Sequence, residues 1–373
     1  MIIPFNEAKN YPYVLIGFVL LSILMLSCHT KEVNSELESI DFNKKYEWKM
    51  VTTWPPNFPV LGEGCNRYAE LVEKLSGGRI TIKVYGGGEL VPPLEVFEAV
   101  NSGAAELGGG SPYYWAGKNP AFQYFSGVPF GMNAQQMTGW MHAGGGYDLW
   151  RKFYAKYNLV PFLAGNTGVQ MGGWYNREIN SIEDFKGLKM RMPGIGGKVL
   201  NAVGATTVLV PGGELYTSLE RGVIDATEWI GPYHDYLMGF HKISKYYYAP
   251  GWHEPGTQLE IILNKREYDK LPVDLQNILQ VAAEEVHTWT LASFESKSYE
   301  YLQKIKSETN VEIREFDQSI LSALKLQTEK VLDELASENE DTKEIYNSYK
   351  AYHDNISQWS DYSEKLYYQK LSK

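Results

Sequence analysis

Leu219-Glu-Arg-Gly-Val-Ile-Asp-Ala-Thr-Glu-Trp229 has the pattern of a helix end followed by a short strand. Gly222 stops the helix, and the β-prone pair Val223-Ile224 then carries Glu228 and Trp229 to the mouth of a domain. A carboxylate beside a tryptophan at a strand end suits a cation or a small ligand. The same residues also fit a solvated loop acid next to a core tryptophan, so the rest of the chain has to decide between these interpretations.

The composition narrows the class of protein. A chain of 373 residues is too long for one ordinary core and predicts two lobes with appendages. The net charge of −10 argues against a nucleic-acid partner, which would need a basic face. Only two cysteines are present, Cys28 and Cys65, in different sequence settings, so they indicate neither a disulfide framework nor a metal site.

The N-terminal segment predicts export. Tyr13–Leu26 is apolar but short for a membrane span, and it has the proportions of a signal-peptide core. Ser27-Cys28 after it is similar to the lipidation site of bacterial lipoproteins. We therefore expect a lipoprotein signal peptide over residues 1–28, lipidation of Cys28 and a polar tether over residues 29–45. An uncleaved N-terminal anchor is the alternative, and both versions tether the body to the membrane.

The next part of the chain, residues 46–158, alternates strand and helix patterns and predicts a first lobe, to which later segments return. The expected elements are strands at 46–54, 80–85 and 106–110 and helices at 60–75 and 94–102. This order favours a parallel sheet covered by helices. The turn Gly86–Gly88 lacks the spacing of a phosphate-binding loop, so we expect a tight turn there.

Residues 159–271 repeat this rhythm and are expected to form mainly a second lobe. Strands are expected at 160–166, 169–176, 188–193 and 206–210, with a helix at 196–203. Two such lobes joined by crossing strands make a hinged cleft.

Residues 272–373 are predicted to form a helical region, with a long helix at 272–306 and another at 320–335. A helix of that length usually leans on something outside its own lobe.

Five motifs in this order resemble the substrate-binding proteins of TRAP transporters, the DctP family. They are Gly87-Gly-Glu-Leu-Val-Pro-Pro-Leu-Glu-Val-Phe97, Gly165-Asn-Thr-Gly-Val-Gln170, Leu188-Lys-Met-Arg-Met-Pro-Gly194, Leu209-Val-Pro-Gly-Gly-Glu-Leu-Tyr216 and Gly222-Val-Ile-Asp-Ala-Thr-Glu-Trp229. The likeness runs from Lys45 to Lys306 and is greatest to the branch that binds 2-oxo acids or lactate together with a metal cation.

The resemblance implies a two-lobed α/β fold of the periplasmic-binding-protein type II, with a hinged cleft and a long C-terminal helix spanning the lobes. It implies a periplasmic receptor without enzymatic activity. Such a receptor captures a small monocarboxylate, such as pyruvate or lactate, together with Na⁺ or Ca²⁺. It then delivers the ligand to the membrane subunits of a TRAP permease, and here a lipid anchor would hold it at the membrane.

The resemblance also assigns residues. Arg191 would pair with the ligand carboxylate, since a guanidinium offers two parallel donors; a surface ion pair is the alternative. The cation ligands would be Gln170, Glu228 and the backbone carbonyl of Trp229, all hard oxygen donors. The residues expected to line the cleft or reach the ligand are Tyr113, Tyr114, Trp115, Asn166 and Glu254. We expect His253 to be a satisfied neighbour and not a ligand.

Two other functions compete with this one. An ABC-type sugar or peptide receptor would explain the 27 tyrosines and 10 tryptophans. A metal-dependent hydrolase could use Glu228 and His234, but the chain has neither an H-E-x-x-H motif nor a G-x-S-x-G elbow.

The resemblance to the 2-oxo-acid branch also implies a possible homodimer through the C-terminal region. Trp289 and Phe294 on the long helix could serve either that contact or internal packing.

Overall fold

The computed structural model describes residues 43–371. The chain divides into two units, Met1–Lys45 and Tyr46–Lys373. The predicted signal peptide, Cys28 and residues 29–42 of the predicted tether lie outside the described residues. Among the helices of residues 43–371, none combines the length and the apolar character that crossing a bilayer requires.

The first lobe is built on a five-stranded sheet. Its strands, in spatial order, are β2 (Ile80–Tyr85), β1 (Tyr46–Thr52), β3 (Leu107–Gly110), β10 (Gln258–Asn264) and β4 (Leu159–Asn166). The first three are parallel, and β10 runs antiparallel to both of its neighbours. The helices of this lobe are α2 (Leu61–Leu75), α3 (Val96–Ser102), α4 (Ala134–Ala143), α5 (Gly146–Ala155) and α9 (Lys265–Asp269).

Strand β3 owes its glycines to close packing. A Cβ on Gly108 would lie 2.6 Å from Val96 Cγ1, and one on Gly109 would lie 2.7 Å from Cys65 Sγ. Side chains from α3 and α2 therefore press on opposite faces of the strand. Only glycine fits where neighbouring elements approach a strand this closely.

The second lobe holds a six-stranded mixed sheet. Its order is β11 (Glu312–Glu315), β9 (Tyr246–Ala249), β5 (Gly173–Tyr175), β8 (Ala226–Thr227), β6 (Lys189–Arg191) and β7 (Thr206–Val208). Its helices are α6 (Gly194–Ala202), α7 (Leu215–Glu220) and α8 (Pro232–Leu237). The strand expected at Val223-Ile224 begins later, at Ala226, because Val223 is exposed and only Ile224 turns inward.

One boundary differs from expectation. We expected the strand at 160–166 in the second lobe, but β4 pairs with β10 along its whole length and so belongs to the first sheet. The chain therefore crosses between the lobes after Asn166, through residues 167–172 to β5. It returns through residues 250–257, from β9 to β10. These two crossing segments carry Gln170, His253 and Glu254.

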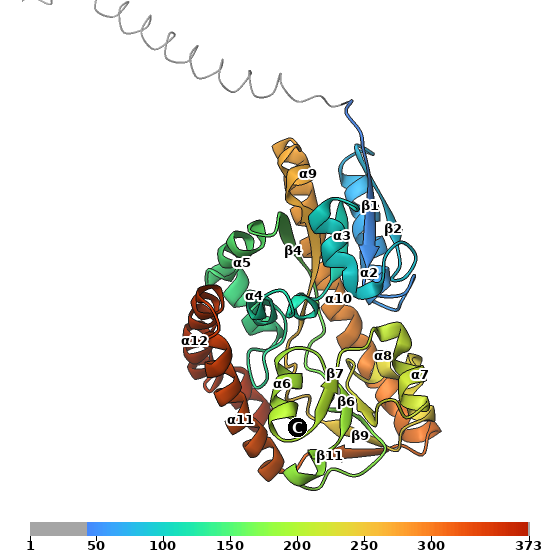
Figure 1. The fold of residues 1–373 in the computed structure, drawn as a ribbon, viewed down its shortest axis with the longest axis vertical. Helices are drawn as coiled ribbons and strands as arrows, with labels where there is room; N and C mark the ends of the chain where they lie inside the picture. The colour runs from blue at the N-terminus through green and yellow to red at the C-terminus, as the bar shows by residue number, and fades with distance from the viewer. Residues whose placement is uncertain (1–42, 372–373) are drawn as a thin grey trace, which may run out of the picture. The chain divides into compact units, whose positions relative to one another are not determined.

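Helix α10 (Val273–Glu308) is the predicted long helix, and it contacts both lobes, since it packs on β4 and α2 as well as on α8. Figure 1 shows β1 and β2 above and β6, β7 and β9 below, with α10 behind both. Phe294 is fully part of the core, and Trp289 is partly buried with the Arg67 guanidinium over its ring. Internal packing therefore accounts for Phe294, and for Trp289 the choice between packing and a dimer face stays open.

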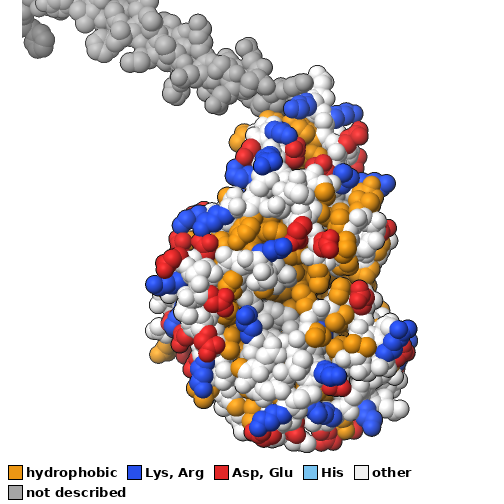
Figure 2. Space-filling model, in the orientation of Figure 1, with side chains coloured by type: hydrophobic (Ala, Val, Ile, Leu, Met, Phe, Trp, Pro, Cys, Tyr) orange, Lys and Arg blue, Asp and Glu red, His pale blue; other side chains and the backbone are white. Residues whose placement is uncertain are grey.

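The chain after α10 forms a second connection between the lobes. Strand β11 joins the second sheet, α11 (Gln318–Ala336) packs on α6, and α12 (Glu340–Ser360) packs on α4 and α5. Figure 1 shows α11 and α12 in red along one side of the molecule, next to elements of both lobes. A last short helix, α13 (Glu364–Lys370), ends the described chain. Charged side chains of both signs are scattered over the face in Figure 2, and hydrophobic ones gather midway between its two ends.

Candidate functional site

A buried ion pair stands at the centre of the site. Arg191 ends β6 and Glu228 follows β8, and these parallel strands pair Arg191 with Thr227. The register therefore brings the two side chains together, and Arg191 Nη1 donates to Glu228 Oε1. Both side chains are 1% exposed. Arg191 Nε also donates to the carbonyl of Val210 at 3.4 Å, which fixes the plane of the guanidinium.

Polar atoms of this pair remain unused. Arg191 Nη2 and Glu228 Oε2 are both buried without a hydrogen-bond partner among the described residues. A buried polar group without a partner costs free energy, and a charged one costs more. Burial lowers the pKa of Arg191, but Glu228, Tyr114, Tyr113 and Glu254 together outweigh the burial and raise it. The arginine is therefore a permanent cation with a free donor.

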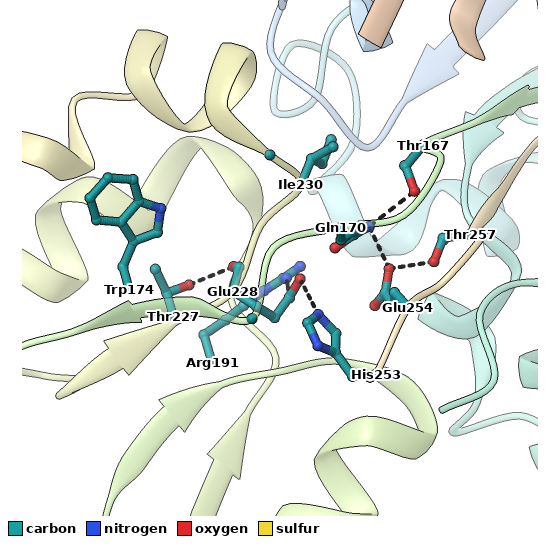
Figure 3. A network of polar contacts seen from close by, with 12 residues as sticks. Thr167, Gln170, Trp174, Arg191, Thr227, Glu228, Ile230, His253, Glu254 and Thr257 are labelled. Atoms are coloured by element: carbon teal, nitrogen blue, oxygen red, sulfur yellow. Dashed lines mark hydrogen bonds and ion pairs between the residues drawn. The ribbon is translucent and has the colours of Figure 1, made fainter. Parts of the chain in front are cut away.

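A second carboxylate faces the pair from the returning segment. Glu254 Oε2 accepts hydrogen bonds from Gln170 Nε2 at 2.7 Å and from Thr257 Oγ1 at 2.5 Å. Gln170 Nε2 also donates to Thr167 Oγ1 at 3.2 Å, so its amide nitrogen is used and its buried Oε1 is left without a partner. Burial and the negative charge of Glu228 raise the pKa of Glu254. Figure 3 shows these residues converging from the two crossing segments and from β6 and β8.

His253 differs from expectation. It is fully buried, its Nε2 lies 3.5 Å from Glu228 Oε2, and neither ring nitrogen has a hydrogen-bond partner within residues 43–371. It is thus not the satisfied neighbour that we expected. Ligand atoms of Glu228, His253 and Glu254 all lie within 4.8 Å of one another. The returning segment therefore brings two titratable side chains to the site, of which the sequence had identified one.

The residues present fit a hard cation. Gln170 Oε1 and Glu228 Oε2 are unpaired oxygen acceptors, and oxygen is the donor that Na⁺ and Ca²⁺ prefer. The chemistry of the donor set therefore accommodates such an ion, and the backbone of Trp229 directly follows Glu228.

The aromatic residues expected at the cleft divide into two groups. Tyr113 and Tyr114 line a small cavity with Gln170 and Trp229, and burial raises the pKa of both tyrosines. Trp115 turns the other way, into the core of the first lobe. Its indole nitrogen donates to Glu260 Oε1 at 2.6 Å, and this buried acceptor explains its direction. The expectation that Trp115 lines the cleft is wrong.

Asn166 is placed at the end of β4, where its amide serves the backbone. Its Nδ2 donates to the carbonyl of Gly256 at 3.2 Å and its Oδ1 accepts from the amide of Gly168 at 2.9 Å. It thus holds the two crossing segments together, and a contact with a ligand stays a prediction. Thr257 was missed because an isolated threonine in a loop carries no motif. Thr167 lies in the motif Gly165–Gln170, but the sequence analysis assigned it no role. His253 was considered and set aside.

Comparison with known proteins identifies a matching protein family. Residues 50–339 match the model of DctP, bacterial extracellular solute-binding protein, family 7. A monocarboxylate 2-oxoacid-binding periplasmic protein of Nostoc sp. (strain PCC 7120) is 37% identical over 346 residues, which cover 92% of this chain and 93% of the relative.

Solved structures agree. The TRAP periplasmic solute-binding protein of Pseudoalteromonas atlantica T6c, with bound sodium and pyruvate, is 41% identical with a TM-score of 0.85 and covers 88% of this chain and 100% of that one. That of Colwellia psychrerythraea, with bound calcium and pyruvate, is 43% identical with the same TM-score and covers 87% of this chain and 99% of that one. The two-lobed fold predicted from the sequence is confirmed by these matches.

Proposed function

The chain belongs to the bacterial extracellular solute-binding proteins of family 7, the DctP family of TRAP solute receptors, and we propose that it binds a small 2-oxo monocarboxylate together with a cation. Pyruvate is the ligand we favour, and lactate is a related candidate. The cation is Na⁺ or Ca²⁺. The relatives with bound sodium or calcium and pyruvate support this assignment.

One observation carries the proposal. Within one buried site, Arg191 Nη2 is a free cationic donor, and Glu228 Oε2 and Gln170 Oε1 are free oxygen acceptors. A carboxylate would satisfy the donor, and a hard cation would satisfy the acceptors. A carboxylate and a cation bound together would also neutralise each other's charge inside the protein. The site is thus complementary to a carboxylate and a cation bound together, and not to either one alone.

The proposed roles follow from this complementarity. Arg191 pairs with the ligand carboxylate, and Gln170, Glu228 and the carbonyl of Trp229 hold the cation. Tyr113 and Tyr114 enclose the ligand, while Glu254 fixes Gln170 from behind and faces the cation. Capture and release need no covalent chemistry, and the function we infer is transport.

The competing functions find less support. The hydrolase would need His234 as a base, but both of its ring nitrogens already lie at hydrogen-bond distance from other groups, Trp229 Nε1 and the Pro59 carbonyl. The ABC-type sugar or peptide receptor rested on the aromatic content. Many of those side chains are core residues, among them Trp140, Trp150 and Tyr154, and they do not line the site.

We further infer a periplasmic location, with the lipid on Cys28 holding the receptor near the TRAP permease that takes up its ligand.

A homodimer stays a proposal as well. Large side chains near the end of the described chain are exposed, namely Trp359, Tyr362, Tyr367, Tyr368 and Leu371, and a second copy would cover them. Light scattering of the purified chain tests the dimer, and mass spectrometry of the N-terminal peptide tests the lipid.

The ligand is tested by thermal denaturation of the full-length chain against pyruvate, lactate, a sugar and a dipeptide, each with Na⁺, with Ca²⁺ and after chelation. A ligand that binds only the folded state raises the melting temperature. We expect a rise with pyruvate plus a cation, lost in Arg191→Lys, which keeps the charge but not the two-pronged geometry. Arg221→Lys, at an exposed position of the same lobe, is the matched control. A rise with the sugar alone would reject the proposed ligand.

A further inference from the structure

Contacts between the lobes gather beside the cation ligands. The loop after β1 belongs to the first lobe, and its Phe58 ring packs edge-on against Trp229 and His234 of the second lobe, with centroid distances of 6.0 and 4.7 Å. A Cβ on Gly213 of the second lobe would lie 3.1 Å from Pro55 Cγ. The loop is therefore seated on the segment that follows β8, at the place where the lobes meet.

His234 makes the polar contact across this junction. Its Nδ1 lies 2.7 Å from Trp229 Nε1, and its Nε2 lies 2.8 Å from the carbonyl oxygen of Pro59. An indole N–H can only donate, so Nδ1 accepts; a carbonyl can only accept, so Nε2 donates. These two requirements fix the neutral tautomer with its proton on Nε2. His234 is fully buried and is fully used by one partner from each lobe.

The same contact reaches the cation site through Trp229. The Arg191 guanidinium lies over the Trp229 ring at 5.1 Å from its centroid, and the backbone of Trp229 directly follows Glu228. Asp235, next to His234, accepts from the amides of Ile230 and Gly231 at 3.1 Å each. The ring and the following backbone are thus both anchored to α8, and α8 is anchored to the first lobe by His234.

We propose that His234 is a positioning residue that latches the closed lobes and holds the Trp229 segment in place for the cation. The inference rests on the proposed function, because it concerns release of that ligand. The bond to Trp229 lies within the second lobe and survives opening. The bond to Pro59 joins the two lobes and breaks when they separate. The latch therefore acts on the closed state and slows ligand release.

Two conservative substitutions test the hydrogen bonds of His234 to Trp229 and to Pro59 one at a time. In His234→Asn the amide stands near the position of Nδ1, so it retains an acceptor for Trp229 and loses the bond to Pro59. In His234→Gln the amide reaches the position of Nε2 and retains a donor to Pro59. The same changes at His241, a histidine of the second lobe that stacks on Tyr236, are the matched controls. Phe58→Leu weakens the latch from the first lobe, should the His234 variants fail to fold.

The measurement is the association and release of radiolabelled pyruvate by the full-length chain in Ca²⁺, with the melting temperature of the unliganded protein. We expect His234→Asn to speed release about tenfold, the effect of ~1.4 kcal/mol from one lost hydrogen bond, with association changed less than twofold. His234→Gln should release pyruvate near the wild-type rate but need several-fold more Ca²⁺. Phe58→Leu should speed release.

Equal release rates in wild type, His234→Asn and Phe58→Leu would overturn the latch, as would a lower melting temperature with no change in release. If the wild type bound no pyruvate with either cation, the proposed function would fail first. That outcome is distinct, because it appears before any variant is compared.

Discussion

At the scale of single residues, Glu228 carries two tasks through its two oxygens. Oε1 neutralises Arg191, and Oε2 stays free for a cation. In Glu228→Gln the amide keeps the shape but not the charge. Removing one partner of a buried ion pair typically costs about 3–5 kcal/mol. We therefore expect the unfolding free energy to fall by about that amount and pyruvate affinity to fall about 100-fold. Urea unfolding and calorimetry measure both, with the exposed Glu220→Gln as control.

Thr257 tests whether Glu254 has to be held in place. Its hydroxyl donates to Glu254 Oε2, and Thr257→Val removes that donor with little change in shape. A hydrogen bond contributes about 0.5–1.5 kcal/mol, so pyruvate affinity should fall by up to about tenfold. Thr328→Val is the control, because that buried hydroxyl donates within α11, to the carbonyl of Leu324. Equal affinities in the two variants would mean that Glu254 needs no support.

Site residues that lie in sequence motifs could be predicted, whereas residues whose role depends on distant contacts could not. Arg191, Glu228 and Gln170 lie in motifs with fixed spacing, and the structure brings all three into one buried site. Trp115 was misplaced because its direction depends on Glu260, which lies 145 residues away. His253 was set aside because nothing local reveals that a buried imidazole lacks a partner. Both errors concern contacts between distant segments.

At the scale of elements, the crossing segments position the site, and Gly168 gives the first of them its shape. Its φ is +69°, and a Cβ there would lie 2.5 Å from Glu295 Oε1 of α10. Gly187 has φ +70° with nothing within 4 Å of such a Cβ, so it carries the same backbone strain without the contact. We expect Gly187→Ala to lose about 1 kcal/mol of stability and Gly168→Ala at least as much, and only Gly168→Ala to weaken pyruvate binding. Equal binding in both would contradict the role of the segment.

Helix α10 carries a pH-sensitive group, His287. Burial, followed by the nearby His142, lowers the pKa of His287 from 6.5 to about 4. The unfolded chain therefore takes up a proton at higher pH than the folded one. Stability is complete above pH 6.5, declines as the pH falls toward 4, and changes no further below it. The loss approaches about 3 kcal/mol. Urea unfolding at pH 7.5 and 4.5 should show a smaller difference in His287→Gln; the same difference as in wild type would contradict this assignment.

The elements themselves were largely predictable. The α10 pattern and the strand–helix alternation of the first lobe follow from local periodicity, and the structure has them within a few residues. The place of β4 was not predictable, since a strand pattern does not say which sheet the strand joins. That choice is made by pairing with β10, about 100 residues later, and no local signal encodes it.

At the scale of the molecule, two connections join the lobes besides the crossing segments. One is α10, and the other is the pair α11 and α12, whose inner residues Leu324, Leu335 and Ile345 are buried in the core. The resemblance seen in the sequence was expected to end at Lys306, which left this tail without a role, but the family match extends to residue 339. The burial of the tail shows that it is part of the folded body. Closure of the cleft has to be compatible with both connections.

The central claim is that carboxylate and cation bind together. Titration calorimetry of the full-length chain with pyruvate tests it, in buffer containing Na⁺, in buffer containing Ca²⁺, and in a sodium-free buffer with a chelator. We predict binding with at least one cation and an affinity at least about tenfold weaker without either, because Glu228 Oε2 and Gln170 Oε1 then stay buried and unpaired. The same affinity in all three buffers would contradict the account.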